Sequence, residues 1–331
     1  MFIIPNYTIA VAFCIITMLC WGSWANTQKL AAKSWRFELF YWDYVWGILI
    51  SAIIIALTLG SIGNQGRSFI PDLQQADWSS LSSAILGGII FNLANILLVA
   101  AISIAGMAVA FPVSIGIALV LGVVVNYLKL PVGNPLLIFG GVAFIVLAIL
   151  LNATAYRNQN KQKGKVSYKG LLISVISGIL MGLFYKYVAS SMFTDFYKPE
   201  PGKLSPYTAV VIFGVGVLIS NFLFNTILMK RPINGTPVSY KDYFKGSFGN
   251  HLTGILGGII WCIGMSFSII ASDKAGIAIS YGLGQGATVV AALWGIYIWK
   301  EFKDASLNTK LILNLMLLFY VSGLALLILA R

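Results

Sequence analysis

Charged side chains are scarce in this sequence. Asp, Glu, Lys and Arg make up 10% of the 331 residues, whereas they make up about 25% of a typical globular protein. Hydrophobic residues make up 59% and occur in long runs that the charged residues separate. So little polar material cannot enclose that much apolar surface in water. The composition therefore excludes a soluble fold and predicts an integral membrane protein.

Cysteine and histidine are also scarce. The three cysteines, Cys14, Cys20 and Cys262, all lie inside apolar runs, and His251 is the only histidine. The cysteine spacing fits no metal or redox motif, and no catalytic constellation occurs at membrane depth. We therefore expect no metal, no cofactor and no enzyme activity. The net charge of +12 comes from basic residues that flank the apolar runs, so we expect no nucleic-acid partner.

The apolar runs predict ten membrane-spanning helices, because about 20 apolar residues are needed to cross a bilayer. The uncharged stretch 78–128 is too long for one helix, so we expect a tight turn at 104–106 and a similar one at 273–276. The predicted spans are 7–29, 38–59, 79–103, 106–128, 134–153, 169–192, 206–229, 250–272, 275–298 and 307–330.

The distribution of basic residues predicts the orientation. Connections on one side of the membrane carry 15 Lys and Arg residues, and those on the other side, including the termini, carry 6. The positive-inside rule places the richer side in the cytoplasm and both termini outside. The predicted cytoplasmic linker is 154–168, between a first repeat at 1–153 and a second at 169–331. Its basic residues are Arg157, Lys161, Lys163 and Lys165.

The two halves resemble each other. An offset of 170 residues aligns 86–90 with 256–260 and gives 12 identities in the 43 positions of 86–128. Three clusters in one register favour a genuine duplication. Each half holds five helices, an odd number, so the second half must cross the membrane in the opposite direction. The predicted fold is therefore all-α, with ten transmembrane helices in two inverted five-helix repeats and a site near the midplane between them.

A second, shorter match occurs at an offset of 160 residues. It aligns Gly22 with Gly182 and Trp24 with Phe184. In the second half, 282–286 carries three glycines, which indicate either a helix-packing seam or locally unwound backbone that lines a cavity.

Several motifs resemble the ureide permease family. They are Trp21-Gly22-Ser23-Trp24, Tyr41-Trp42-Asp43-Tyr44, 58–63, and 74–78 followed by Gly87-Gly88 and Asn95. This family belongs to the drug/metabolite transporter superfamily and is close to bacterial glucose/ribose porters. The resemblance implies the five-plus-five fold and import of allantoin, uracil and related heterocycles with protons, or of sugars. Plant members carry a nucleotide-binding-like motif in the central loop. Here only 164–167 remains of it, so we expect no use of ATP.

Charged residues inside a membrane span are functional candidates. Asp43 is the main candidate for proton coupling, because a carboxylate at that depth is costly unless it is hydrated, paired or protonated. The alternative is an acid held near a helix N-terminus by basic neighbours. Glu38 is a second coupling candidate, or a solvated residue of the first helical turn. Lys186 is either an anchor at the membrane interface or a cation that binds substrate.

Polar and aromatic residues at membrane depth supply the other substrate-binding candidates. The predicted substrate-binding residues are Trp21, Trp24, Asn92, Asn95, Lys186, Tyr281 and Gln285. The tryptophans would stack on a flat ring or a sugar face. The amides would bind polar groups of the substrate, unless they only bond between helices. His251 is expected near the membrane interface, with a titrating role as an alternative.

These features predict a secondary active transporter that imports a small neutral polar metabolite, either a nucleobase or ureide or a sugar, by proton-coupled alternating access. An alternative is an exporter of lipophilic or cationic compounds, which would need an acid central to the cavity. The expected partners are the substrate, a proton or sodium ion, and the lipid bilayer. We expect a monomer or homodimer in the inner (plasma) membrane of a bacterium.

Overall fold

The computed structural model describes residues 1–32, 34–160, 167–233 and 235–331. Ten helices in these ranges are long and apolar enough to cross a membrane, which confirms the predicted number. The protein is thus an all-helical integral membrane protein. Eight spans are single helices: α2 Phe37–Leu57, α4 Trp78–Ala105, α5 Met107–Lys129, α6 Pro135–Asn160, α7 Tyr168–Ser191, α8 Pro206–Lys230, α10 Phe248–Ala275 and α13 Leu307–Leu329. The first span is α1 Tyr7–Ser23 with the 3₁₀ helix η1 Trp24–Leu30, and the ninth is α11 Ile277–Gln285, α12 Ala287–Leu293 and the π-helical turn η2 Trp294–Ile298. Two short helices, α3 Phe69–Gln74 and α9 Tyr240–Phe244, lie between spans.

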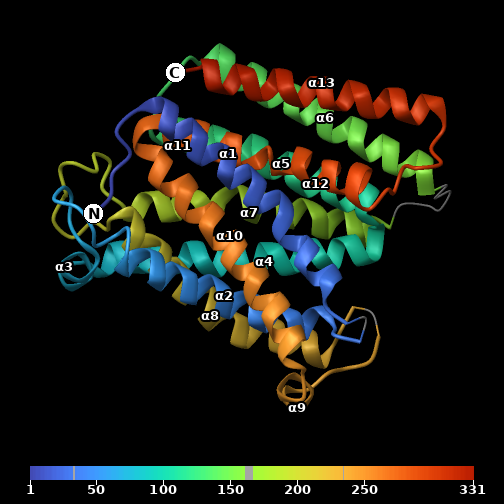
Figure 1. Ribbon diagram of the computed structural model, residues 1–331, viewed down its shortest axis with the longest axis horizontal. Coiled ribbons are helices and arrows are strands. Elements are labelled where there is room, and N and C mark those ends of the chain that lie inside the picture. The colour runs from blue at the N-terminus through green and yellow to red at the C-terminus, as the bar shows by residue number, and fades with distance from the viewer. Residues whose placement is uncertain (33, 161–166, 234) are drawn as a thin grey trace.

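Successive spans run in alternating directions, so the molecule has two ends. Figure 1 shows both termini and α3 at one end, which we call the terminal end, and α9 at the other. We call the opposite end, where Leu30, Ala105, Lys230 and Ile298 lie, the linker end. The predicted linker 154–168 is partly helical, because α6 continues to Asn160. Its remaining part, with Lys161, Lys163 and Lys165, falls mainly outside the described residues.

Two glycines make the predicted tight turns. Gly106 separates α4 from α5, and Gly276 separates α10 from α11. Their backbone angles are almost equal, with φ 81° and ψ 154° at Gly106 and φ 83° and ψ 149° at Gly276. Only glycine occupies this region without strain, because it has no Cβ. The turns are 170 residues apart, which is the offset of the sequence match.

Helix packing follows the same correspondence. α4 packs against α7 and α8, and α10 packs against α1 and α2. α4 and α10 each contain 28 residues, and each follows a short surface helix, α3 or α9. These matching contacts support the duplication, and the inverted repeat stays a prediction.

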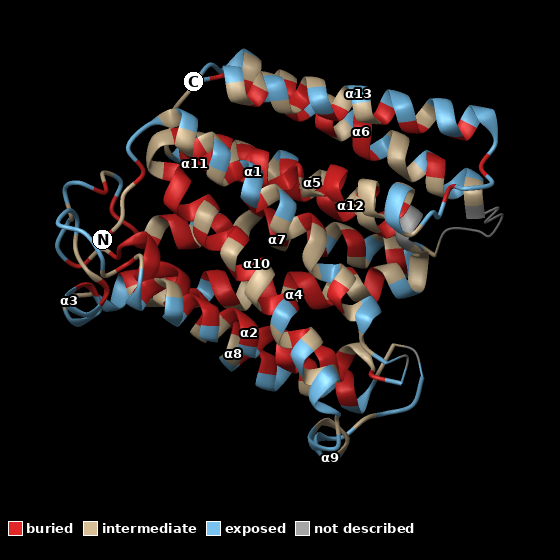
Figure 2. Cartoon of the chain, viewed as in Figure 1, coloured by how far each residue is buried: buried red, intermediate tan, exposed pale blue. Residues whose placement is uncertain are grey.

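Burial separates a packed centre from an apolar outer surface. Figure 2 shows buried residues along α4, α7 and α10 and many exposed residues along α13. α13 packs mainly against α6, and its exposed residues are largely apolar, including Leu311, Leu315 and Leu318. An exposed apolar helix face is expected where a helix meets lipid. The centre of the bundle holds the polar side chains described next.

Candidate functional site

A cavity lies between the two halves of the chain. It measures about 160 Å³, more than ten times the ~10–15 Å³ that one water molecule needs. It therefore has room for a small solute. The lining residues come from α1, η1, α4, α5, α7, α10, α11 and α12: Trp21, Gly22, Trp24, Ala25, Phe91, Asn95, Leu98, Phe111, Ile115, Met181, Phe184, Trp261, Gln285, Ala287, Thr288 and Ala291.

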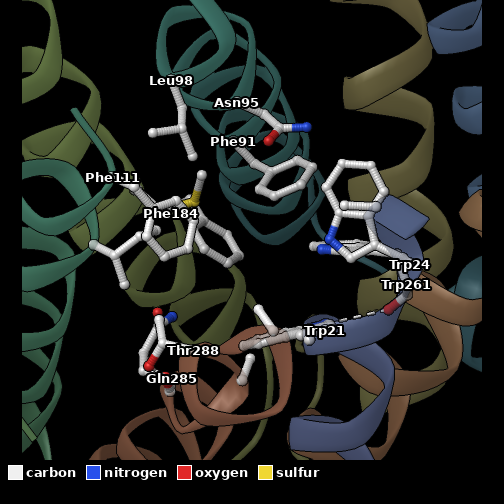
Figure 3. A pocket seen from close by; sticks show the side chains of 16 residues that line it. Trp21, Trp24, Phe91, Asn95, Leu98, Phe111, Phe184, Trp261, Gln285 and Thr288 are labelled. Atoms are coloured by element: carbon white, nitrogen blue, oxygen red, sulfur yellow. Dashed lines mark hydrogen bonds between the residues drawn. The ribbon is translucent and has the colours of Figure 1, made fainter. Parts of the chain in front are cut away.

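Aromatic rings form much of the cavity wall. The rings of Trp21 and Trp261 stack with centroids 5.9 Å apart, and the indole nitrogen of Trp21 donates to the carbonyl oxygen of Trp261 at 3.2 Å. Phe91 packs on Trp261 at 4.3 Å and on Phe184 at 5.2 Å. Figure 3 shows Trp21, Trp24 and Trp261 on one side of the cavity and Phe184 on another. These contacts fix the rings, so a flat or apolar solute face would meet a preformed surface.

Three polar side chains face the same space. In Figure 3, Asn95 lies on one side of the cavity, and Gln285 and Thr288 lie on the opposite side. Asn95 donates from Nδ2 to the Tyr41 hydroxyl at 3.1 Å, and its carbonyl oxygen has no hydrogen bond to any described residue. The Gln285 side chain makes no hydrogen bond to any described residue, although only 7% of Gln285 is exposed. A primary amide this buried needs a partner, and the cavity is where a solute or water would supply one.

Corresponding residues of the two halves meet at the cavity. With the offset of 170, Phe91 corresponds to Trp261 and Ile115 to Gln285; all four line the cavity. With the offset of 160, Trp21 corresponds to Met181 and Trp24 to Phe184, and these also line it. The space therefore lies where the predicted repeats face each other.

The cavity extends from the middle of the helices toward the linker end. α4 contributes Phe91, Asn95 and Leu98 in that direction, and Trp24 lies in η1 at the linker end of the first span. Helix α11 ends at Gln285, and α12 begins after Gly286. The interrupted helix thus presents Gln285 and Thr288 to the cavity.

The network behind Asn95 explains the position of Asn92. The Tyr41 hydroxyl donates to Asn92 Oδ1 at 2.9 Å, and Asn92 Nδ2 donates to Ser220 Oγ at 2.9 Å. Asn92 is fully buried and does not line the cavity. It joins α4 to α2 and α8 and so supports Asn95 from behind.

Two other predicted binding residues lie away from the cavity lining. The Tyr281 hydroxyl is buried and donates to the carbonyl oxygens of Ala118 at 3.1 Å and Met181 at 3.2 Å, so it connects α11 to α5 and α7. Lys186 is exposed and lies near the terminal end of α7. The structure brings Trp21, Trp24, Asn95 and Gln285 together, but not Asn92, Lys186 or Tyr281.

Asp43 is the centre of a second polar cluster, near the linker end. Its Oδ1 accepts from the Tyr243 hydroxyl at 2.7 Å and lies 2.9 Å from His251 Nδ1. The residue is 2% exposed, and its second oxygen, Oδ2, has no partner among the described residues. Burial and the bond to Asp43 raise the pKa of Tyr243 above its usual range, so this phenol stays protonated and donates.

Glu38 has a different environment. Arg36 donates to both of its carboxylate oxygens, with Nε 3.1 Å from Oε2. Glu38 is 5% exposed and does not line the cavity. The two bonds from one guanidinium form a bidentate pair, so Glu38 and Arg36 resemble a structural anchor at the start of α2.

Comparison with known proteins assigns the chain to a family. The profile of the ureide permease family matches residues 40–169 and 158–330. The chain belongs to the ureide permease family. Ureide permease 1 of Arabidopsis thaliana is 24% identical over 383 residues, which cover 99% of this chain and 98% of that protein. The glucose uptake protein GlcU of Bacillus subtilis is 26% identical over 226 residues, covering 66% and 69% of the two chains.

A solved crystal structure also has this fold. It aligns over 96% of both chains with a TM-score of 0.64 at 17% identity. Because this family consists of permeases, the chain is a membrane transporter of small metabolites and not an enzyme.

Several residues that line the cavity or contact Asp43 were not among the candidates predicted from the sequence. Phe91 and Trp261 were detectable in principle, because the offset of 170 aligns two aromatic residues at membrane depth. The contacts of Asp43 with Tyr243 and His251 were not detectable. They join residues about 200 positions apart, and only the fold brings Tyr243 of α9 and His251 of α10 against α2.

Proposed function

We propose that this protein is a secondary active transporter that imports a small neutral polar metabolite by alternating access, and that the cavity between its halves binds that metabolite. The observation that carries the proposal is the pairing of fixed aromatic rings with two carboxamides, Asn95 and Gln285, that have unused hydrogen-bonding groups. Membrane transporters commonly bind substrate near the midplane between repeats.

The two carboxamides favour a cyclic amide or urea as the first substrate class to test. A primary amide presents a donor and an acceptor side by side, and a ureide or nucleobase presents the complementary edge together with a flat face. The ureide permease relatives match over nearly their whole length, which supports the same choice. A sugar is the second candidate, since its apolar face also stacks on tryptophan and GlcU is a relative.

The absence of charge from the cavity favours a neutral solute. None of the described lining residues is Asp, Glu, Lys, Arg or His. A multidrug exporter for cations would need a carboxylate here, because an unpaired cation is costly at this depth. The cavity lining therefore favours a neutral metabolite over a cationic compound as the transported solute.

Proton coupling is assigned to Asp43 in this proposal. Its hydrogen-bond partners are the Tyr243 hydroxyl and the His251 ring, and its Oδ2 has no partner among the described residues. Sodium is typically coordinated by several oxygen atoms, including backbone carbonyls, whereas the partners of Asp43 are one hydroxyl and one ring nitrogen, which suits a proton carried by the carboxyl group. Glu38 is the less favourable coupling residue, because Arg36 occupies both of its oxygens.

A short chain of contacts connects this cluster to the cavity. Tyr44 follows Asp43 in α2, and its ring packs on Trp24 with centroids 4.6 Å apart. Asp43 also packs on α10 at Gly254, and α10 carries Trp261 into the cavity wall. A change in the charge of Asp43 would thus act on two helices that line the binding space.

Uptake into proteoliposomes tests this proposal. We expect an inward proton gradient, with the outside more acidic than the lumen, to drive accumulation of labelled allantoin, uracil or glucose. One of these substrate classes should be strongly preferred. Asp43→Asn should abolish accumulation but retain exchange of substrate, and Glu38→Gln, the matched control, should still accumulate it. Accumulation by Asp43→Asn that still follows the pH gradient would remove Asp43 from the mechanism.

Cysteine labelling tests the orientation. Labelling of Arg157→Cys only from the cytoplasmic side is expected if both termini lie outside the bacterial inner membrane.

A further inference from the structure

A second hollow lies away from the cavity, at the linker end of α13. It measures about 340 Å³ and lies between η2, the following turn and the first turns of α13. We call it the lysine groove. Its lining residues are Ile296, Tyr297, Lys300, Phe302, Lys303, Lys310, Leu313, Asn314 and Leu317. They share no residue with the cavity or the Asp43 cluster.

Three lysines give the groove a concentrated positive charge. Lys300, Lys303 and Lys310 are all exposed, and no ion pair to them occurs among the described residues. The nearby Glu301 is engaged elsewhere, because it accepts from Lys29 at 3.4 Å and from the Tyr156 hydroxyl at 2.7 Å. Asp304 is the one other acid in this turn, and it does not line the groove. The groove therefore has a net positive charge that no acid among the described residues neutralises through an ion pair.

Apart from Asn314, the rest of the groove is lined by apolar and aromatic residues and continues into the lipid-facing surface. Leu313 and Leu317 lie one turn apart on α13 and follow Lys310 in the direction of the membrane interior. The neighbouring positions Leu311, Leu315 and Leu318 are exposed, and Figure 2 shows many exposed residues along that helix. The lysines lie at the ends of two membrane spans, 277–298 and 307–329, which is the depth of lipid headgroups.

We propose that the lysine groove binds an anionic phospholipid of the leaflet on the linker side. The headgroup phosphate would contact Lys300, Lys303 and Lys310, and an acyl chain would lie along Leu313 and Leu317. Basic pockets between transmembrane helices at headgroup depth suit this ligand class. A soluble phosphate would use the lysines but not the apolar floor. A second copy of the chain would have to bury three uncompensated lysines, which is costly.

Native mass spectrometry of the detergent-purified full-length chain tests the proposal. The probes are phosphatidylglycerol, phosphatidylcholine with the same acyl chains, and glycerol phosphate. We expect one phosphatidylglycerol to bind tightly, with phosphatidylcholine and glycerol phosphate each binding at least roughly 10-fold more weakly. Equal binding of the two lipids, or of glycerol phosphate, would overturn the proposal, as would a protein–protein dimer that is lost when Lys300, Lys303 and Lys310 are replaced.

Matched variants locate the site. Lys300→Gln, Lys303→Gln and Lys310→Gln combined should weaken phosphatidylglycerol binding by roughly 100-fold. The control combines Lys169→Gln, Lys241→Gln and Lys245→Gln, three exposed lysines of the same end outside the groove, and should bind as the wild type does. Equal losses in both variants would show general charge attraction and overturn the site. Crosslinking of photoreactive phosphatidylglycerol to wild-type 300–317 gives a test that does not depend on variant folding, and labelling elsewhere would contradict the proposal.

Discussion

Replacing Gln285 with alanine separates a binding role from a structural one. The Gln285 side chain makes no hydrogen bond to described residues, so its removal should cost the folded protein little. If the amide binds substrate, its loss leaves a polar group of the substrate unpaired, which costs about 1–3 kcal/mol. That corresponds to roughly 5–150-fold weaker affinity. Melting temperature should stay close to that of the wild type.

Asn92 provides the contrasting variant. Its side chain bonds to Tyr41 and Ser220 at 2.9 Å each and lies outside the cavity lining. Asn92→Ala leaves the buried Tyr41 hydroxyl without its acceptor, so about 1–3 kcal/mol of stability should be lost. Its direct effect on affinity should be small, apart from any movement of Asn95.

Both quantities can be measured on the purified protein in detergent. Quenching of tryptophan fluorescence reports binding, because Trp21, Trp24 and Trp261 line the cavity, and thermal unfolding reports stability. The expected pattern is weaker binding with unchanged melting for Gln285→Ala and lowered melting for Asn92→Ala. The reverse pattern, unchanged affinity with lowered melting for Gln285→Ala, would refute the assignment of this cavity as the binding site.

Three further predictions use the same assays and uptake measurements. Trp24→Ala should weaken substrate binding by at least about 0.5–1.5 kcal/mol and also lower the melting temperature, since Trp24 packs on Tyr44; unchanged affinity would place the stacking surface elsewhere. Gly258→Ala should lower the melting temperature, because the new Cβ would lie 2.0 Å from the Tyr44 carbonyl oxygen, an overpacking that costs about 1–3 kcal/mol. Gly116→Ala is the control and should leave the melting temperature unchanged, because its new Cβ would meet no atom within 4 Å. Equal melting temperatures of the two variants would argue against the close contact of α2 and α10. Asp43→Asn should make uptake insensitive to the pH gradient, and a wild-type pH profile in that variant would argue against coupling through this carboxylate.

The helices and their turns could be predicted from sequence because local composition decides them. Apolar runs must become helices in lipid, where every backbone polar group needs a partner, and the charge-free stretch 78–128 was too long for one span. Positive φ at Gly106 fits the turn expected there. The end of α6 was less predictable, since polar residues after 153 continue the helix as far as Asn160.

The candidate site was only partly predictable because it depends on contacts between distant segments. Tryptophan and amide residues at membrane depth correctly indicated Trp21, Trp24, Asn95 and Gln285 as residues that share one space, although their role in binding stays a prediction. The sequence could not separate Asn95 from Asn92, which differ by less than one helical turn. Their different partners on α2 and α8 decide which amide reaches the cavity and which lies behind it.

Substrate-specific binding at the cavity is the most direct test of the central claim. Equilibrium binding of labelled allantoin, uracil and glucose to wild type and Gln285→Ala should be measured under identical conditions. The account predicts saturable binding of one neutral class by the wild type and at least roughly 5-fold weaker binding by Gln285→Ala. Saturable binding that is the same in both proteins would show that the substrate site lies outside the cavity described here.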